Sequence, residues 1–133
     1  ETAQVVQNAG FGISTAMDIG GDKIAGTSFV NALKKFQEDE QTDAVVMFGE
    51  LGGTYESQVA EFLEENPDFD LPIIAFITGK FTEDMPSQQY GHAGAVIRGD
   101  QDKPSYKEKV LRESGVHVVD VHHEIGEKLQ ELV

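Results

Sequence analysis

The chain has 133 residues, 39% of them hydrophobic, which is enough to bury the core of one ordinary domain. Its 24 acidic and 10 basic residues give a formal net charge of −14, which repels nucleic-acid phosphates and anionic membrane surfaces. The lack of cysteine excludes disulfides and thiol catalysis, and it is typical of a cytoplasmic protein. We therefore expect no nucleic-acid partner and no role at a membrane.

The first third of the chain predicts a helix, a strand and a second helix. Residues 1–9 favour a helix that ends at Gly10, and residues 13–19 favour a short strand. Thr27 or Ser28 can cap the next helix, because their hydroxyl groups can accept a hydrogen bond from its first turn. The apolar residues that share one face of this helix are Phe29, Val30, Leu33 and Phe36.

The middle of the chain predicts two buried strands with a helix between them. Residues 43–48 form a continuous apolar run, and a glycine-rich turn follows over residues 49–54. Residues 55–66 are amphipathic and end before Pro67, as helices commonly do. Residues 71–77 form the second buried strand.

A long connection and three short elements complete the chain. Residues 80–104 join the second buried strand to the next helix, and a connection this long inside a compact domain is usually functional. Residues 104–114 favour a helix with Gly115 at its end, residues 117–121 a strand, and residues 124–132 a helix.

Apolar strands separated by amphipathic helices indicate an α/β fold in which helices cover both faces of a mainly parallel sheet. We predict a flavodoxin-like three-layer sandwich that forms one domain over residues 1–133. The alternation calls for a first strand ahead of residues 1–9, so we expect the domain to be incomplete at its N-terminal end. The gap would lie between strands 13–19 and 43–48, and we expect another chain or an upstream segment to fill it, and not direct pairing of these two strands.

The long connection carries the most unusual stretch, QYGHAGAVI over residues 89–97. It places His92 among small residues, and glycine allows a close approach that a β-carbon would block. A histidine that accepts a phosphoryl group needs one free ring nitrogen and nearby backbone amides, which Gly91, Ala93 and Gly94 can leave unobstructed. The alternative is a tight turn with an incidental histidine.

The other candidate residues follow the ends of the expected strands, which meet at one edge of a parallel sheet. Glu50 could orient His92, although a solvated acid at a strand end is an equal alternative. Gly52 and Gly53 could bind phosphate at the start of a helix, or could simply cap it. Gly20 and Gly21 are assigned to substrate binding from their position after the strand 13–19.

The remaining histidines do not predict a metal site. His117 lies in a strand pattern, and the adjacent His122 and His123 cannot both point the same way. A solvated helix start is the better interpretation of these residues with Glu124. Nucleotide-binding signatures such as a phosphate-binding loop with lysine are also missing from the sequence.

Four stretches together resemble the ligase domain of the succinyl-CoA synthetase alpha subunit and the related region of ATP-citrate lyase. They occur in the family's order and span nearly the whole chain: DIGGDKIAGTSF (residues 18–29), VVMFGELGGTYES (45–57), PIIAFITG (72–79) and GHAGAVI (91–97). Among them, GELGG followed by GHAGA at this distance is the specific combination.

This resemblance implies an acid–CoA ligase of the kind that forms a nucleoside diphosphate. In such enzymes the histidine of GHAGA takes phosphate from ATP and passes it to a carboxylate, and the thiol of coenzyme A attacks the acyl phosphate. His92 is then the phosphohistidine and Glu50 the carboxylate that orients it. Gly91, Ala93 and Gly94 form the phosphohistidine loop.

The resemblance also implies partners that this chain does not supply. They are an ATP-grasp beta subunit or module, a CoA-binding domain, a small carboxylate substrate, ATP or GTP with magnesium, and coenzyme A, within a cytoplasmic or mitochondrial-matrix oligomer. We expect the isolated chain to bind none of these cofactors stably and to be inactive. The alternative function is a non-catalytic assembly or regulatory module that kept the fold and lost the relay; Asp100 and Asp102 stand where the family has further glycines.

Overall fold

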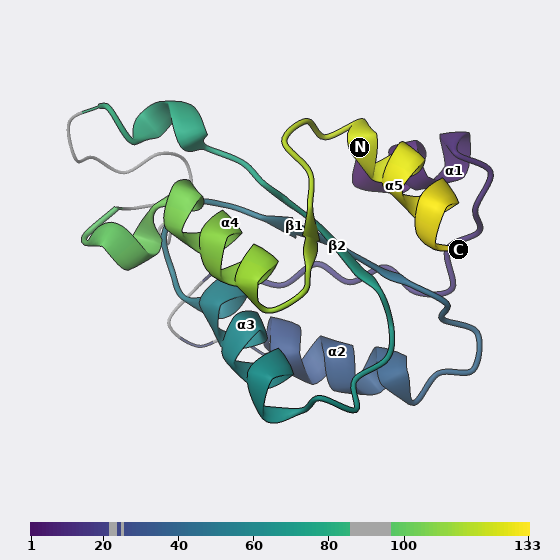
Figure 1. Ribbon diagram of the computed structural model, residues 1–133. Helices are drawn as coiled ribbons and strands as arrows, with labels where there is room; N and C mark the ends of the chain where they lie inside the picture. The colour runs from purple at the N-terminus through teal and green to yellow at the C-terminus, as the bar shows by residue number, and fades with distance from the viewer. Residues whose placement is uncertain (22–23, 25, 86–96) are drawn as a thin grey trace.

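The computed structural model describes residues 1–21, 24, 26–85 and 97–133, which form a three-layer α/β domain (Figure 1). Its sheet contains β1 (Val45–Gly49), β2 (Ile73–Ile77) and β3 (His117–Val118) in the order β1-β2-β3. Both pairings are parallel, with Val45 opposite Ile73 and Ile74 opposite His117. The prediction of a parallel, flavodoxin-like α/β fold is confirmed, and within the described residues the sheet begins at β1.

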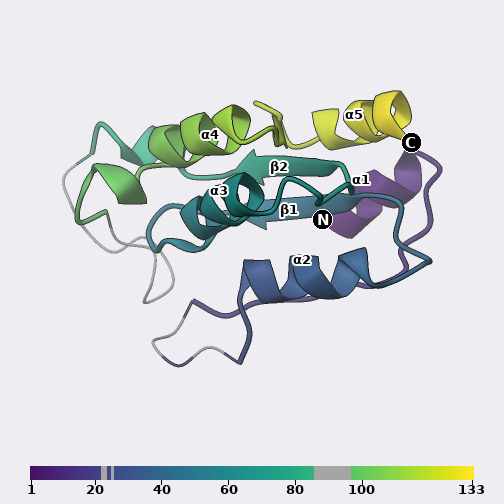
Figure 2. The ribbon, with the colours of Figure 1, turned by 60° about the horizontal axis from the view of Figure 1, so that its bottom comes forward.

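Helices cover both faces of this sheet. The face with α2 (Phe29–Gln37), α3 (Tyr55–Glu65) and α4 (Pro104–Glu113) holds the larger apolar core. The opposite face is covered by α1 (Thr2–Asn8) and α5 (Glu124–Leu132), which lie side by side (Figures 1 and 2). The two cores share the sheet because successive residues of a strand point to opposite faces.

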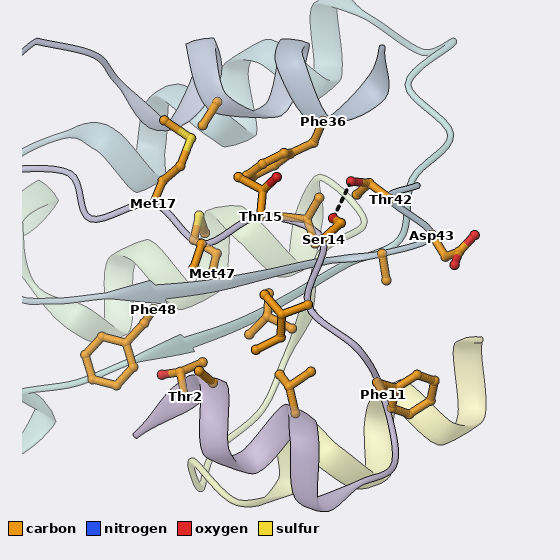
Figure 3. A pocket seen from close by; sticks show the side chains of 18 of the residues that line it. Thr2, Phe11, Ser14, Thr15, Met17, Phe36, Thr42, Asp43, Met47 and Phe48 are labelled. Carbon is orange, nitrogen blue, oxygen red and sulfur yellow. Dashed lines mark hydrogen bonds between the residues drawn. The ribbon is translucent and has the colours of Figure 1, made fainter. Parts of the chain in front are cut away.

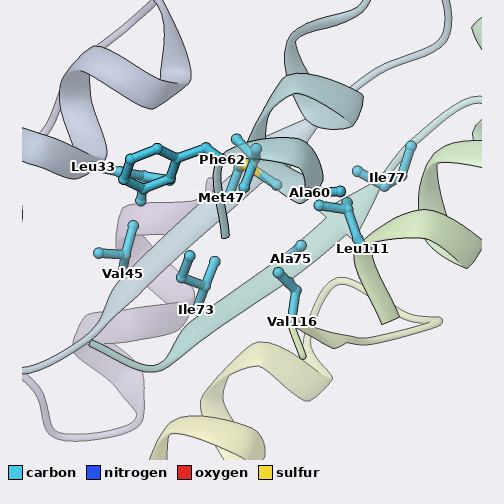
Figure 4. Packing of buried hydrophobic residues seen from close by; sticks show 11 residues of the cluster. Leu33, Val45, Met47, Ala60, Phe62, Ile73, Ala75, Ile77, Leu111 and Val116 are labelled. Atoms are coloured by element: carbon cyan, nitrogen blue, oxygen red, sulfur yellow. The ribbon is translucent and has the colours of Figure 1, made fainter. Parts of the chain in front are cut away.

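The alternation is visible in β1 and β2: β2 is buried on both faces, whereas in β1 Val46 is half-buried and Phe48 is exposed. Val45 and Met47 point into the larger core together with Ile73 and Ala75 (Figure 4). Ile74 points into the core under α1 and α5. Burial of each large aliphatic side chain contributes roughly 1.5–3 kcal/mol, so these short strands have a strong packing reason to form.

Local signals set the helix ends where the sequence predicted them. The Ser28 hydroxyl accepts a hydrogen bond from the Asn31 amide at 3.3 Å and caps α2, which resolves the choice between Thr27 and Ser28. Pro104 occupies the first turn of α4, and Gly115 follows that helix with φ +92°, a left-handed conformation that favours glycine.

The strand predicted over residues 13–19 is wrong. This segment runs beside β1 in irregular conformation, and in the described part of the chain no backbone hydrogen bond joins it to β1. A strand needs a partner at about 4.8 Å, and the only direct contact by hydrogen bond here is between the hydroxyl groups of Ser14 and Thr42, at 2.9 Å.

The last strand is shorter than predicted. Residues 117–121 were expected to be extended, but only His117 and Val118 form the ladder. The chain then turns, because Glu124 accepts hydrogen bonds from the amides of Asp120 and Val121 at 3.2 and 3.0 Å. In the described ranges, no helix combines the length and the apolar composition that crossing a bilayer requires.

Candidate functional site

The candidate site lies at the carboxyl edge of the sheet, where the loops after β1 and β2 begin. The first loop, residues 50–54, leads from Gly49 into α3. The second passes through Thr78 and Gly79, and the Thr78 amide donates to the Gly49 carbonyl at 2.9 Å. Parallel strands bring both loops to the edge at which ligands bind in open α/β sheets.

Glu50 is half-buried and directly follows β1, at the edge where the sequence predicted it. Its amide donates to Oε1 of Glu56 at 3.2 Å, and its carbonyl accepts a hydrogen bond from Nζ of Lys107 at 2.7 Å. These two bonds fix the backbone from which the Glu50 carboxylate extends.

Gly52 and Gly53 form a left-handed pair, with φ values of +79° and +65°, just before α3. The Gly52 amide donates to the Asp102 carbonyl at 2.8 Å, so in this structure it is used to hold the loop. Gly53 is exposed, and the side chain of Thr54, the N-cap of α3, makes no capping hydrogen bond. The start of α3 therefore offers polar backbone to an anion mainly at Gly53.

His92 and its neighbours Gly91, Ala93 and Gly94 lie outside the described residues. The segments on either side of them are described, as η1 (Lys80–Thr82) and η2 (Asp100–Asp102). The bond from Gly52 to Asp102 joins η2 to the first loop.

Two carboxylates at this edge are engaged within their own segments. Asp102 accepts hydrogen bonds from the amides of Arg98 and Gly99 at 2.9 and 3.2 Å and so closes the turn of η2. Asp100 pairs with Lys103 at 2.5 Å, and this hydrogen bond and charge hold the pKa of the Asp100 carboxyl below its usual value. The negative charge that the sequence places here is thus partly compensated.

Gly20 and Gly21, the predicted substrate-binding pair, are exposed at the end of the segment that runs beside β1. A Cβ built at either glycine would meet no atom within 4 Å, so nothing packs against them. Figure 2 shows the segment that leads to them running in the same direction as β1. The structure does not place them in contact with Glu50.

A groove of about 670 Å³ separates residues 11–19 from β1 (Figure 3). Its floor and walls come from α1, α2, β1 and the end of α5, and most of the lining is apolar: Val6, Phe11, Phe29, Leu33, Phe36, Met47 and Leu129 are examples. The groove lies where the missing strand was expected.

A second charged cluster joins the ends of β2 and β3 to α4. Lys80 contacts Glu108 at 2.7 Å and Asp120 at 3.3 Å, while Arg112 contacts the same two carboxylates, each at 3.1 Å. The hydrogen bond from Lys80 chiefly lowers the pKa of Asp120, and Glu108 chiefly raises the pKa of Lys80. No group of acidic or histidine side chains suited to a metal ion occurs among the described residues.

Sequence analysis missed Glu56 and Lys107, the two side chains that hold the loop of Glu50. Both are buried, although charged residues on helices are usually solvated. One signal was present: Lys107 stands three residues after Pro104 and four before Leu111, on the stripe of α4 that faces the core.

Comparison with known proteins agrees with this fold. The profile of the CoA-ligase family matches residues 1–117. The ADP-forming succinate–CoA ligase subunit alpha of Staphylococcus epidermidis is 43% identical over 129 residues, covering 97% of this chain. The corresponding subunit of Staphylococcus aureus is 40% identical over 131 residues, covering 98% of it. The chain spans only 41–42% of the length of these relatives.

Solved structures give the same relationship. A variant of ATP citrate lyase from Methanosaeta concilii, solved with (3S)-citryl-CoA, superposes with a TM-score of 0.78 at 26% identity. The match covers 85% of this chain and 18% of the lyase chain. The enzyme from Methanothrix soehngenii, solved with citrate and coenzyme A, superposes with the same score. The match across residues 1–117, together with the parallel sheet and the loop that follows Gly49, shows that this chain belongs to the CoA-ligase family.

Proposed function

We propose that residues 1–133 are the ligase domain of an acid–CoA ligase that forms a nucleoside diphosphate, with His92 as the phosphate-carrying residue. One observation carries this proposal. Glu50 is fixed at the carboxyl edge beside the exposed Gly53, and η2, which follows the His92 segment, is bonded to the same loop through Gly52. The described loop that carries Glu50 is thus joined to the segment that follows His92 in the sequence, which supports a shared site for the relay.

The proposed reaction requires this chain to accept the phosphoryl group, to stabilise the charge that forms, and to release the phosphoryl group to the substrate. A ring nitrogen of neutral His92 attacks the terminal phosphorus of the nucleotide, so that an N–P bond forms and the bond to the departing diphosphate breaks. The ring then carries positive charge, and the Glu50 carboxylate offsets that charge and holds the other ring nitrogen. When the phosphoryl group passes to the carboxylate substrate, the N–P bond breaks and the ring becomes neutral again.

The residues present fit a phosphate group at the start of α3. Gly53 is exposed in a left-handed conformation, and the positive end of the α3 dipole faces the same side. Gly91, Ala93 and Gly94 would supply further backbone amides. Nucleotide with magnesium supplies the phosphoryl group and neutralises its charge when bound.

The rest of the reaction belongs to partners. Because this chain spans about two-fifths of its relatives' length, we assign nucleotide binding to a beta-type ATP-grasp subunit or module and coenzyme A to a separate CoA-binding domain. We propose a cytoplasmic or mitochondrial-matrix oligomer in which the isolated chain is inactive. Gly20 and Gly21 would approach the substrate, a small carboxylic acid of the succinate or citrate class.

The test is phosphate transfer from labelled ATP in the assembled enzyme. We expect acid-labile label on His92 in the parent protein and none in His92→Asn, with Glu50→Gln reduced by about 10- to 100-fold. His123→Asn is the matched control. It should label fully, because His123 is an exposed residue at the N-cap of α5. Full labelling of His92→Asn would overturn the proposal.

One observation favours a second candidate, a non-catalytic assembly module. The Gly52 amide is occupied by the Asp102 carbonyl, and Asp100 adds a carboxylate near the same loop. A parent protein that assembles with its partner but takes no label would support this second function.

A further inference from the structure

Lys107 is the most fully buried charged side chain of the described residues, with no exposed surface. Its ammonium has three N–H donors and meets three acceptors: the carbonyls of Glu50 and Gly52, and Oε2 of Glu56. The distance to Glu50 is 2.7 Å and that to Glu56 is 2.6 Å. One side chain from α4 thus binds the loop after β1 at two backbone points.

Glu56 holds the same loop from the other side. Its side chain is 5% exposed, and its two oxygens have separate partners. Oε2 binds Lys107, and Oε1 accepts the amide hydrogen of Glu50 at 3.2 Å. Glu50 therefore has both its backbone amide and its backbone carbonyl fixed by one buried ion pair.

The strand end is shaped to admit this pair. A Cβ at Gly49 would lie 2.6 Å from Oε1 of Glu56, so a side chain there would displace the carboxylate. Further along the loop, Gly52 and Gly53 both take left-handed conformations, and Gly53 is exposed.

We propose that Lys107 and Glu56 are positioning residues: they set the backbone of residues 50–53 so that the Glu50 carboxylate and the Gly53 amide face the phosphoryl group. This inference rests on the proposed function of the site. A buried ion pair contributes little net stability compared with well-packed apolar side chains, so packing alone does not account for it. Its contacts are directed at backbone atoms of one loop.

The experiment uses the full-length chain assembled with its nucleotide-binding partner. The variants are Lys107→Met, Glu56→Gln, and the double change Lys107→Met with Glu56→Leu, which removes both charges together. We measure the thermal midpoint, hydrogen exchange of the loop amides of residues 50–53, and the rate of labelling from ATP. Glu108→Gln is the matched control, because it breaks another buried ion pair on α4 that does not contact this loop.

We expect Lys107→Met to lower the thermal midpoint, because it leaves a buried carboxylate without its partner. The double variant should recover most of that midpoint, while its loop amides exchange about tenfold faster and its labelling rate falls about 10- to 100-fold. For loop exchange and labelling rate, Glu56→Gln should give values between those of the parent and the double variant, since its amide oxygen can still accept the hydrogen bond from the Glu50 amide. Glu108→Gln should lower the midpoint and leave both loop exchange and labelling rate unchanged.

A double variant with parental midpoint, exchange and labelling would overturn the positioning role. Failure of the proposed function gives a different result, in which the parent itself takes no label above His92→Asn. Loop exchange then still decides the inference: faster exchange in the stable double variant supports positioning of the loop, and unchanged exchange refutes it.

Discussion

Gly49 illustrates how one missing side chain decides local geometry. A Cβ there would lie 2.6 Å from both Oε1 of Glu56 and Cδ1 of Ile77, below any normal contact distance. We predict that Gly49→Ala destabilises the domain by roughly 1–3 kcal/mol through overpacking. Urea unfolding followed by circular dichroism measures this change as a lower midpoint.

Gly99→Ala provides the control for that change. Gly99 is extended, and a Cβ there would meet no atom within 4 Å, so its replacement should alter stability by less than about 0.5 kcal/mol. Equal unfolding midpoints for Gly49→Ala and the parent protein would show that the strand end has room for a side chain.

At the scale of elements, α4 is joined to the ends of β2 and β3 by the cluster of Lys80, Glu108, Arg112 and Asp120. The pKa of Asp120 is lowered in the folded state, first by its hydrogen bond with Lys80. Its contribution to stability is therefore present above the unfolded pKa of about 3.9, and is lost as the pH falls through the folded pKa.

We predict that Asp120→Asn lowers the thermal midpoint at pH 7 and that the difference from the parent closes as the pH falls below the unfolded pKa of about 3.9 and through the lower folded pKa. The effect should be small, because the Asp120 side chain is 69% exposed and solvent screens the pair. Asp70→Asn removes another exposed charge, one that has no ion pair in the described part of the chain, and should change little. A constant difference between Asp120→Asn and the parent from pH 7 to the acid limit would contradict the role of Asp120 ionisation.

The elements also show what the sequence can and cannot predict. The helix α5 was predicted to the residue, and Ser28 and Gly115 marked helix ends, because caps and apolar periodicity are local. The strand predicted over residues 13–19 was wrong because a strand depends on a distant pairing partner, which a local sequence pattern does not reveal. Part of the site was equally hidden: Glu56 and Lys107 are 51 residues apart, and only the packing of α3 on α4 brings them together.

At the scale of the whole molecule, the groove runs along the outer edge of β1, which has no neighbouring strand on that side among the described residues. The Val45 amide donates to the carbonyl of Pro72, the residue before β2. Because successive residues of a strand direct their backbone amides and carbonyls to opposite sides, those of Val46 and Phe48 face the groove. We predict that an extended apolar segment of about six residues pairs with this edge.

Amide hydrogen exchange checks this pairing. In the isolated chain Val46 and Phe48 should exchange fast and Val45 slowly, and an added β-branched peptide should slow the first two and leave Val45 unchanged. Slow exchange at all three amides before any addition would mean that the edge is already closed by residues 11–19.

The contact between α1 and α5 has a consequence for how the molecule is made. Thr2 bonds His122 across 120 residues of sequence, and Gln130 reaches the Ala9 carbonyl across 121. The apolar side of α1 can be covered only after α5 has been synthesised, and at about 5–20 residues per second that interval is roughly 6–24 s. Among the described helices, α1 is therefore the one that must wait longest for its binding surface.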